Sequence, residues 1–123
     1  MIITYLGGEF IKVQFGDTTL AFNPISKDSS LKTAKFGADI VLSSINHPDM
    51  NGVDQVSFGD KKAFAISGPG EYEVKGVFIK GLPSESDYDG EKRINTIYTV
   101  TLEGMNICFL GAVNTVELPK DTY

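Results

Sequence analysis

The fold of this chain is decided by residues 40–52, which read IVLSSINHPDMNG. The apolar run at 40–42 predicts a buried strand. A polar turn follows it and carries His47, the only histidine of the chain, with Asp49 two residues later. Imidazole and carboxylate groups bind metal ions and transfer protons, so this turn is the first place to look for chemistry.

The rest of the chain is rich in predicted strands, because short apolar or alternating runs are separated by turn residues. A hairpin is expected at Gly16-Asp17, a turn at 68–70, and a bulge at Gly76 within the alternating stretch 72–80. Residues 83–93 are polar and predict a loop. The remaining strands are expected at 2–6, 10–15, 18–22, 38–43, 63–67, 96–102 and 106–110.

Helix is expected to be scarce. Residues 26–35 could form one short helix that Gly37 ends, and residues 52–56 could form a single turn. Residues 58–61 read as a turn, and a further helix could begin at Leu118. The sequence therefore predicts one or two short helices on a mixed, mostly antiparallel sheet.

Bulk properties limit the classes of function. The chain has 123 residues, enough for one domain with its own core, and its net charge is −5. The eleven basic residues are scattered, which argues against nucleic acid or anionic membrane as a partner. A single cysteine, Cys108, excludes an internal disulfide, and Met1–Tyr5 lacks the pattern of a signal peptide. We expect a cytoplasmic protein that does not cross a membrane.

Five short segments, in this order, resemble the metallo-β-lactamase superfamily, in particular its branch of small metal-dependent hydrolases similar to ascorbate-6-phosphate lactonase. They are TYLGG (4–8), LAFNP (20–24), GPGEYEV (68–74), NTIY (95–98) and ICFLG (107–111). The resemblance implies a strand-rich α/β fold, half of an αββα sandwich, over residues 1–123 as a single half-domain. It also implies a loop after residues 40–42 of the form His-x-His-x-Asp-His, which holds two zinc ions in the family.

In this chain most ligands of that loop are replaced. Ile45 stands at the first histidine position, His47 at the second, Asp49 at the aspartate and Met50 at the third histidine. The resemblance places a further histidine at Ser86 and a bridging aspartate at Ala112, and a last histidine in a second half of the fold.

Neither metal would keep two of its usual protein ligands. Zinc needs three or four nitrogen, oxygen or sulfur donors, so we expect no metal and no cofactor, and His47 and Asp49 are the only metal candidates. What remains is a cleft around His47, Asp49, Ser86 and Ala112, with no catalytic residue assigned. His47 is then a structural residue that caps its turn through Asp49 or a backbone carbonyl.

Cys108 lies among apolar neighbours and is predicted to be an inert core residue. The family's αββα sandwich has two similar halves, and this chain resembles the first. An apolar sheet face left in water is unfavourable, so a partner is expected. A second copy of the chain is the first choice, and a complementary second half-domain is the alternative.

Three functions follow. The first is a metal-free pseudoenzyme, a non-catalytic binding or assembly module on a hydrolase scaffold. The alternative is a metal-dependent hydrolase of lactone, phosphoester or acyl substrates, with zinc or manganese held by donors from another chain or a C-terminal half, or by Asn46, Asp87 or Asp89. The third is a fragment without a function of its own. Metal analysis separates the first two.

Overall fold

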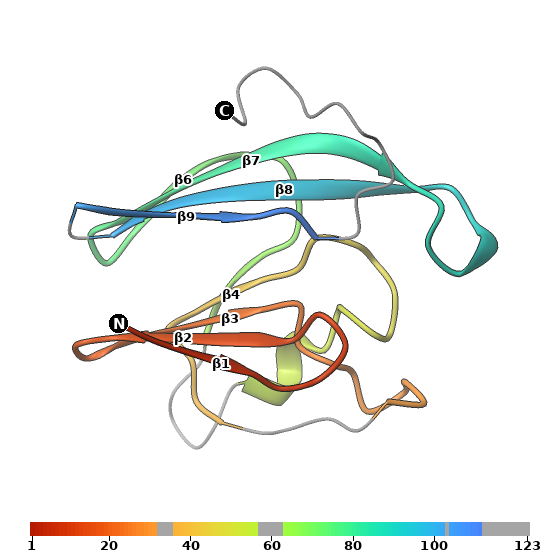
Figure 1. The fold of residues 1–123 in the computed structure, drawn as a ribbon, viewed down its shortest axis with the longest axis horizontal. Helices are drawn as coiled ribbons and strands as arrows, with labels where there is room; N and C mark the ends of the chain where they lie inside the picture. Colours follow the sequence, from red (N-terminus) through yellow and green to blue (C-terminus); the bar gives the residue numbers. More distant parts are fainter. Residues whose placement is uncertain (32–35, 57–62, 103, 112–123) are drawn as a thin grey trace. The chain divides into compact units, whose positions relative to one another are not determined.

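The computed structural model describes residues 1–31, 36–56, 63–102 and 104–111 (Figure 1). The chain divides into two compact units, Met1–Ser67 and Gly68–Tyr123. Each unit contains one sheet, and the elements follow one another along the chain without exchange between the sheets. Two short 3-10 helices, η1 (Val53–Val56) and η2 (Tyr88–Gly90), are the helices of the described residues.

The first unit holds a mixed five-stranded sheet with the strands in sequence order. The two hairpin-like pairs at its start are antiparallel, whereas β3, β4 and β5 run parallel to one another. Parallel neighbours need a crossover connection, which the longer segments between these strands supply. The strands are β1 (Ile2–Tyr5), β2 (Ile11–Phe15), β3 (Thr18–Phe22), β4 (Ile40–Leu42) and β5 (Phe64–Ile66).

β4 is buried on both faces, as its uninterrupted apolar run predicts. On one face, Ala21 of β3 stands beside Val41 of β4, and both belong to a core cluster. Phe10 and Val56 pack into the same cluster from outside the sheet. The predicted turn at residues 52–56 is confirmed as η1. Its Val56 carbonyl accepts a hydrogen bond from the N–H of Ala38, which lies two residues before β4 (2.8 Å).

The second unit holds a four-stranded antiparallel sheet, β6 (Gly70–Val74), β7 (Val77–Ser86), β8 (Arg93–Leu102) and β9 (Met105–Phe109). The bulge predicted at Gly76 is wrong. Lys75 and Gly76 instead form the two-residue turn of the β6–β7 hairpin, and both have positive φ (51° and 80°). Positive φ at both positions is what a type I′ turn requires.

The loop predicted at residues 83–93 is wrong at its two ends, because β7 continues to Ser86 and β8 begins at Arg93, whereas residues 87–92 connect the two strands. Polar residues in this stretch are held in a strand by pairing with β8 rather than by their own alternation. The β6 partner ends where Gly70 pairs with Gly81, so Pro83 lies in a part of β7 with one neighbour. A strand with one open side tolerates proline.

Other expectations have mixed outcomes. Residues 26–31 form turns and bends rather than a helix, and residues 32–35 of that predicted helix lie outside the described residues. The predicted turn at 58–61 and the predicted helix at Leu118 lie outside them as well. The final hairpin is confirmed, with Leu102 paired to Met105. No helix of the described stretches is long and apolar enough to span a membrane.

Gly52 marks a close approach between the end of the loop that follows β4 and the segment that follows β3. Its N–H donates to the Pro24 carbonyl (2.7 Å). A Cβ at Gly52 would lie 2.5 Å from the carbonyl carbon of Ile25, which is backbone and cannot rotate away.

We therefore expect Gly52→Ala to lower the free energy of unfolding by about 1–3 kcal/mol, the usual cost of overpacking. The matched control is Gly68→Ala, because a Cβ at Gly68 meets nothing within 4 Å. Urea denaturation followed by circular dichroism measures both. Equal stability of the two variants would contradict the close approach.

Candidate functional site

The candidate site lies at the carboxyl ends of the parallel strands β3, β4 and β5 in the first unit. Asn23 follows β3, Ser43 follows β4 and Ser67 follows β5. In sheets with parallel strands, ligands bind outside the carboxyl ends of the strands. The residues that follow these three strands therefore define the chemistry that this edge offers, and all three are neutral and polar.

Asn23 fastens the loop after β4 to the end of β3. Its amide nitrogen donates to the Ser44 hydroxyl (2.8 Å), and its amide oxygen accepts from the Ser44 N–H (2.7 Å). Asn23 is fully buried and has a φ of 48°, a conformation that asparagine adopts more readily than most residues. Its N–H also donates to the Leu42 carbonyl (2.7 Å), so the residue bridges both neighbouring chain segments.

Ser43 holds the two ends of the loop together from inside. Its buried hydroxyl contacts the Ile45 carbonyl (3.1 Å) and the Met50 carbonyl (2.8 Å). The Met50 N–H in turn donates to the His47 carbonyl (2.8 Å). The loop is thus closed on itself by its own backbone and one serine.

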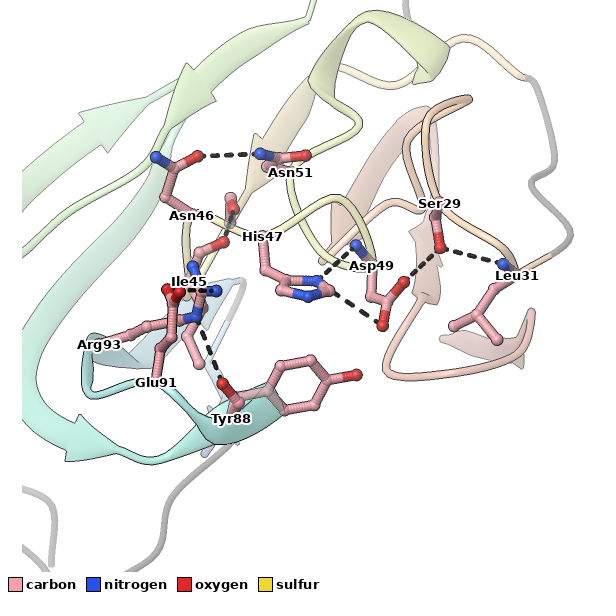
Figure 2. Close-up of polar contacts among 11 residues, drawn as sticks. Ser29, Leu31, Ile45, Asn46, His47, Asp49, Asn51, Tyr88, Glu91 and Arg93 are labelled. Atoms are coloured by element: carbon pink, nitrogen blue, oxygen red, sulfur yellow. Dashed lines mark hydrogen bonds and ion pairs between the residues drawn. The ribbon is translucent and has the colours of Figure 1, made fainter.

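The His47 ring serves the turn that carries it. Its Nδ1 accepts a hydrogen bond from the Asp49 N–H (3.0 Å), as Figure 2 shows. The same Nδ1 lies 3.6 Å from a carboxylate oxygen of Asp49, which is too long for a hydrogen bond, so the contact with the backbone N–H is the one that orients the ring. An accepting Nδ1 carries no proton, and the neutral ring then holds its proton on Nε2.

The Asp49 carboxylate has a partner far away in sequence. It accepts a hydrogen bond from the Ser29 hydroxyl, and the Ser29 oxygen also accepts from the Leu31 N–H (3.0 Å) (Figure 2). Ser26 joins the same two segments through a bond from its N–H to the Pro48 carbonyl (2.7 Å). Asp49 therefore contributes to the attachment of the loop to residues 26–31.

Ile45 and Met50 are core residues, 2% and 1% exposed. These are the positions where the family motif has histidines. Both side chains are apolar and supply no donor of the kind that zinc binds tightly, since a thioether is a weak ligand for a hard or borderline cation. The loop therefore keeps two of the four motif residues, and both make contacts within the fold.

The other predicted site residues belong to the second unit. Ser86 is buried, and its hydroxyl accepts from the Tyr88 N–H (3.3 Å). Asp87 is exposed, and its carbonyl accepts from the Gly90 N–H at the η2 turn (3.2 Å). Ser86 pairs in register with Arg93, whose guanidinium binds Glu91 (3.0 Å).

Two further candidates are not described. Ala112 lies outside the described residues, and so does the side chain of Asp89. Asn46, the last of the alternative donors, is exposed, and its amide oxygen accepts from the Asn51 amide nitrogen (2.9 Å). Within residues 1–31, 36–56, 63–102 and 104–111, no three His, Cys, Asp or Glu residues gather to hold a metal ion. The described donor set does not fit a zinc ion, which needs three or four strong donors.

Cys108 is not a core residue, so that prediction is wrong. It is exposed on β9, an edge strand, where alternate side chains of an apolar run point away from the core. Desolvation nevertheless raises the pKa of its thiol, so the thiolate that would act as a nucleophile is disfavoured. The expected inertness of Cys108 thus rests on the partial desolvation of its thiol and not on a place in the core.

Two contacts of the site were not foreseen from the sequence. The Asn23-Pro24 pair predicts only the end of a strand, and nothing local indicates that the Asn23 amide binds Ser44. Ser29 lies in a polar stretch, and its bond to Asp49 joins residues twenty positions apart. Contacts of this kind depend on the packing of β3 against β4, which no local pattern reports.

We expect Asn23→Ala to lower the free energy of unfolding by about 2–4 kcal/mol, because it strands the buried Ser44 N–H and leaves an alanine at positive φ. Ser44→Ala removes only the hydroxyl and should cost about 1 kcal/mol. Denaturant unfolding of both variants and of the double variant closes a double-mutant cycle. Additive losses would show that the two side chains do not interact.

The comparisons with known proteins agree with this fold. A family model described as a beta-lactamase superfamily domain matches residues 2–121. No curated protein matches the sequence. A Thermotoga maritima protein, named as a candidate zinc-dependent hydrolase of the metallo-β-lactamase superfamily, is similar in structure, with a TM-score of 0.73 and 26% identity. That match covers 97% of this chain and 53% of the other.

Two more distant structures show the same fold. A candidate metal-dependent hydrolase from Parabacteroides distasonis has a TM-score of 0.65 at 16% identity, over 90% of this chain and 60% of that one. CmlA, a diiron β-hydroxylase from Streptomyces venezuelae, has a TM-score of 0.64 at 12% identity, over 94% of this chain and 30% of that one. The chain spans about half the length of the first of these structures. The predicted fold class, a strand-rich half of an αββα sandwich, is confirmed.

Proposed function

The chain belongs to the β-lactamase superfamily, and we propose that it is a non-catalytic member, a binding and assembly module on a hydrolase fold. The resemblance recognised in the sequence is thereby confirmed at the level of the family. We propose that His47 and Asp49, which stand at metal-ligand positions of the family motif, stabilise the fold of this chain and do not bind a metal ion.

One observation carries this proposal: the His47 Nδ1 is engaged by the Asp49 N–H. Zinc binds a nitrogen lone pair. At Nδ1 the ion would displace the backbone donor. At Nε2 it would require the proton to move to Nδ1, which faces that same N–H and lies 3.6 Å from an Asp49 carboxylate oxygen. The buried Ile45 and Met50 offer no strong donors beside the ring to offset either cost.

A metal-dependent hydrolase is the second candidate, and the Thermotoga maritima structure favours it, because its name describes a zinc-dependent hydrolase at 26% identity. In that case zinc or manganese would need donors beyond the described residues or from another chain. The substrate would be a lactone, a phosphoester or an acyl compound. The two candidates differ in one measurable property, the affinity of this chain for metal.

We expect untagged protein, dialysed against zinc and then against buffer, to retain only substoichiometric metal, because a single engaged imidazole cannot supply a zinc site. Mass spectrometry of the metal content and isothermal titration measure this. His47→Ala is the control and should behave like the parent chain. Retention of one zinc ion per chain that His47→Ala abolishes would contradict the metal-free proposal and favour the second candidate.

The assembly part of the proposal rests on β1, the edge strand of the first sheet. Ile2, Ile3 and Tyr5 are 62%, 60% and 68% exposed, and the strand has neither charge nor proline. Native proteins usually protect edge strands with charge, proline or a covering segment. We propose that β1 pairs antiparallel with β1 of a second copy, which makes a two-fold interface from identical surfaces.

Light scattering at micromolar concentration should therefore give twice the mass of one 13.4 kDa chain. Ile3→Lys should give the mass of one chain, because two lysines would meet at the two-fold axis. The matched control is Ile94→Lys, an isoleucine that is 69% exposed on the central strand β8, and it should leave the mass doubled. A single-chain mass for the parent protein would contradict the pairing and leave a separate half-domain as the partner.

The cytoplasm is the compartment that we propose. The chain has one cysteine, Cys108, so it cannot form a disulfide bond within itself. A single exposed thiol is compatible with the reducing conditions of that compartment.

A further inference from the structure

A hollow of about 430 Å³ opens in the first unit beside the loop that follows β4. Its volume falls in the range of sites for small molecules. Its lining includes Ser43 and Ser67, the residues that follow β4 and β5. The hollow therefore lies at the carboxyl ends of these adjacent parallel strands, where ligands bind in such sheets. It is lined by Ser43, Asn46, Asn51, Val53, Ala65 and Ser67.

The described residues that line the hollow carry no charge. Its polar side chains are two amides and two hydroxyls, and its apolar side chains are Val53 of η1 and Ala65 of β5. A charged ligand would give up its hydration there without gaining a counterion from these described residues, which is costly. The hollow therefore favours an uncharged ligand that has one apolar face.

Its two amides specify the polar edge of that ligand. The Asn51 amide nitrogen donates to the Asn46 amide oxygen (2.9 Å), and Figure 2 shows the two side chains pointing toward each other. This bond uses one of the two hydrogens on the Asn51 nitrogen. The Asn51 oxygen and second hydrogen remain as an acceptor and a donor on one amide group, which another amide can complement.

We infer that this hollow binds a small uncharged molecule with a primary carboxamide group, whose amide pairs with Asn51 while its ring or chain lies against Val53 and Ala65. The inference rests on the proposed binding function and adds a ligand class to it. It does not involve His47, Asp49 or a metal. A negative result here and a positive zinc result are therefore separate outcomes with separate meanings.

The probe that tests this is benzamide, with benzoate as a control of the same shape that carries a negative charge. In a titration followed by ¹H–¹⁵N correlation spectra, benzamide should shift the resonances of residues that line the hollow, with a Kd of about 1 mM, as expected of a fragment. Benzoate at the same concentrations should shift them at least tenfold less. Equal effects of the two probes, or no effect of benzamide, would overturn the inference.

Asn51→Leu removes the amide at similar volume and should weaken benzamide binding at least tenfold. The matched control is Asn106→Leu, an exposed asparagine of β9 in the second unit, which should leave binding unchanged. Ser67→Val serves as a second variant at an exposed position and should weaken binding several-fold, which decides the matter if Asn51→Leu does not fold. Unchanged binding in the variant that folds would exclude this hollow as the site.

Discussion

The bidentate contact between Asn23 and Ser44 is the constraint on which the rest of the site depends. It joins the residue after β3 to the loop after β4 through two buried hydrogen bonds. The Ser43 hydroxyl then contacts the Met50 carbonyl within that loop. At the far end of the loop, the Gly52 N–H donates to the Pro24 carbonyl, beside the close approach to Ile25. The loop is thus held at its start, its middle and its end by neutral groups, without any need for a metal ion to organise it.

This neutral organisation has a consequence for chemistry. In a metal-binding loop, imidazoles and carboxylates are kept available and are oriented by other groups. Here the two remaining residues of that kind are themselves part of the scaffold, since His47 accepts from Asp49 and Asp49 accepts from Ser29. The groups that face the adjacent hollow are amides and hydroxyls. Amides and hydroxyls of this kind can form hydrogen bonds with neutral ligands.

Strong local patterns predicted the strands of the fold well. β4 follows from its apolar run, and the hairpin of β2 and β3 follows from Gly16-Asp17. The polar end of β7 was missed, because its strand conformation comes from pairing with β8. Gly76 was assigned to a bulge because the alternation changes phase there, but a change of phase also marks a two-residue turn.

The site was predictable in its residues and not in its contacts. The replacement of ligands by Ile45 and Met50 is visible in the sequence, as is the pairing of His47 with Asp49 in one turn. The roles of Asn23 and Ser29 were not, because their partners lie about twenty positions away and are brought close only when β3 pairs with β4. Cys108 was misplaced for a related reason, since an apolar run on an edge strand buries only alternate side chains.

The protonation of the His47 ring tests the central claim most directly. Untagged protein has a single histidine, so long-range ¹H–¹⁵N correlations of the imidazole report on this ring alone. At about pH 8, where an ordinary imidazole is neutral, the account predicts a proton on Nε2, an unprotonated Nδ1, and no change when one equivalent of zinc is added. A proton on Nδ1, or a zinc-dependent shift of the Nε2 resonance, would contradict it.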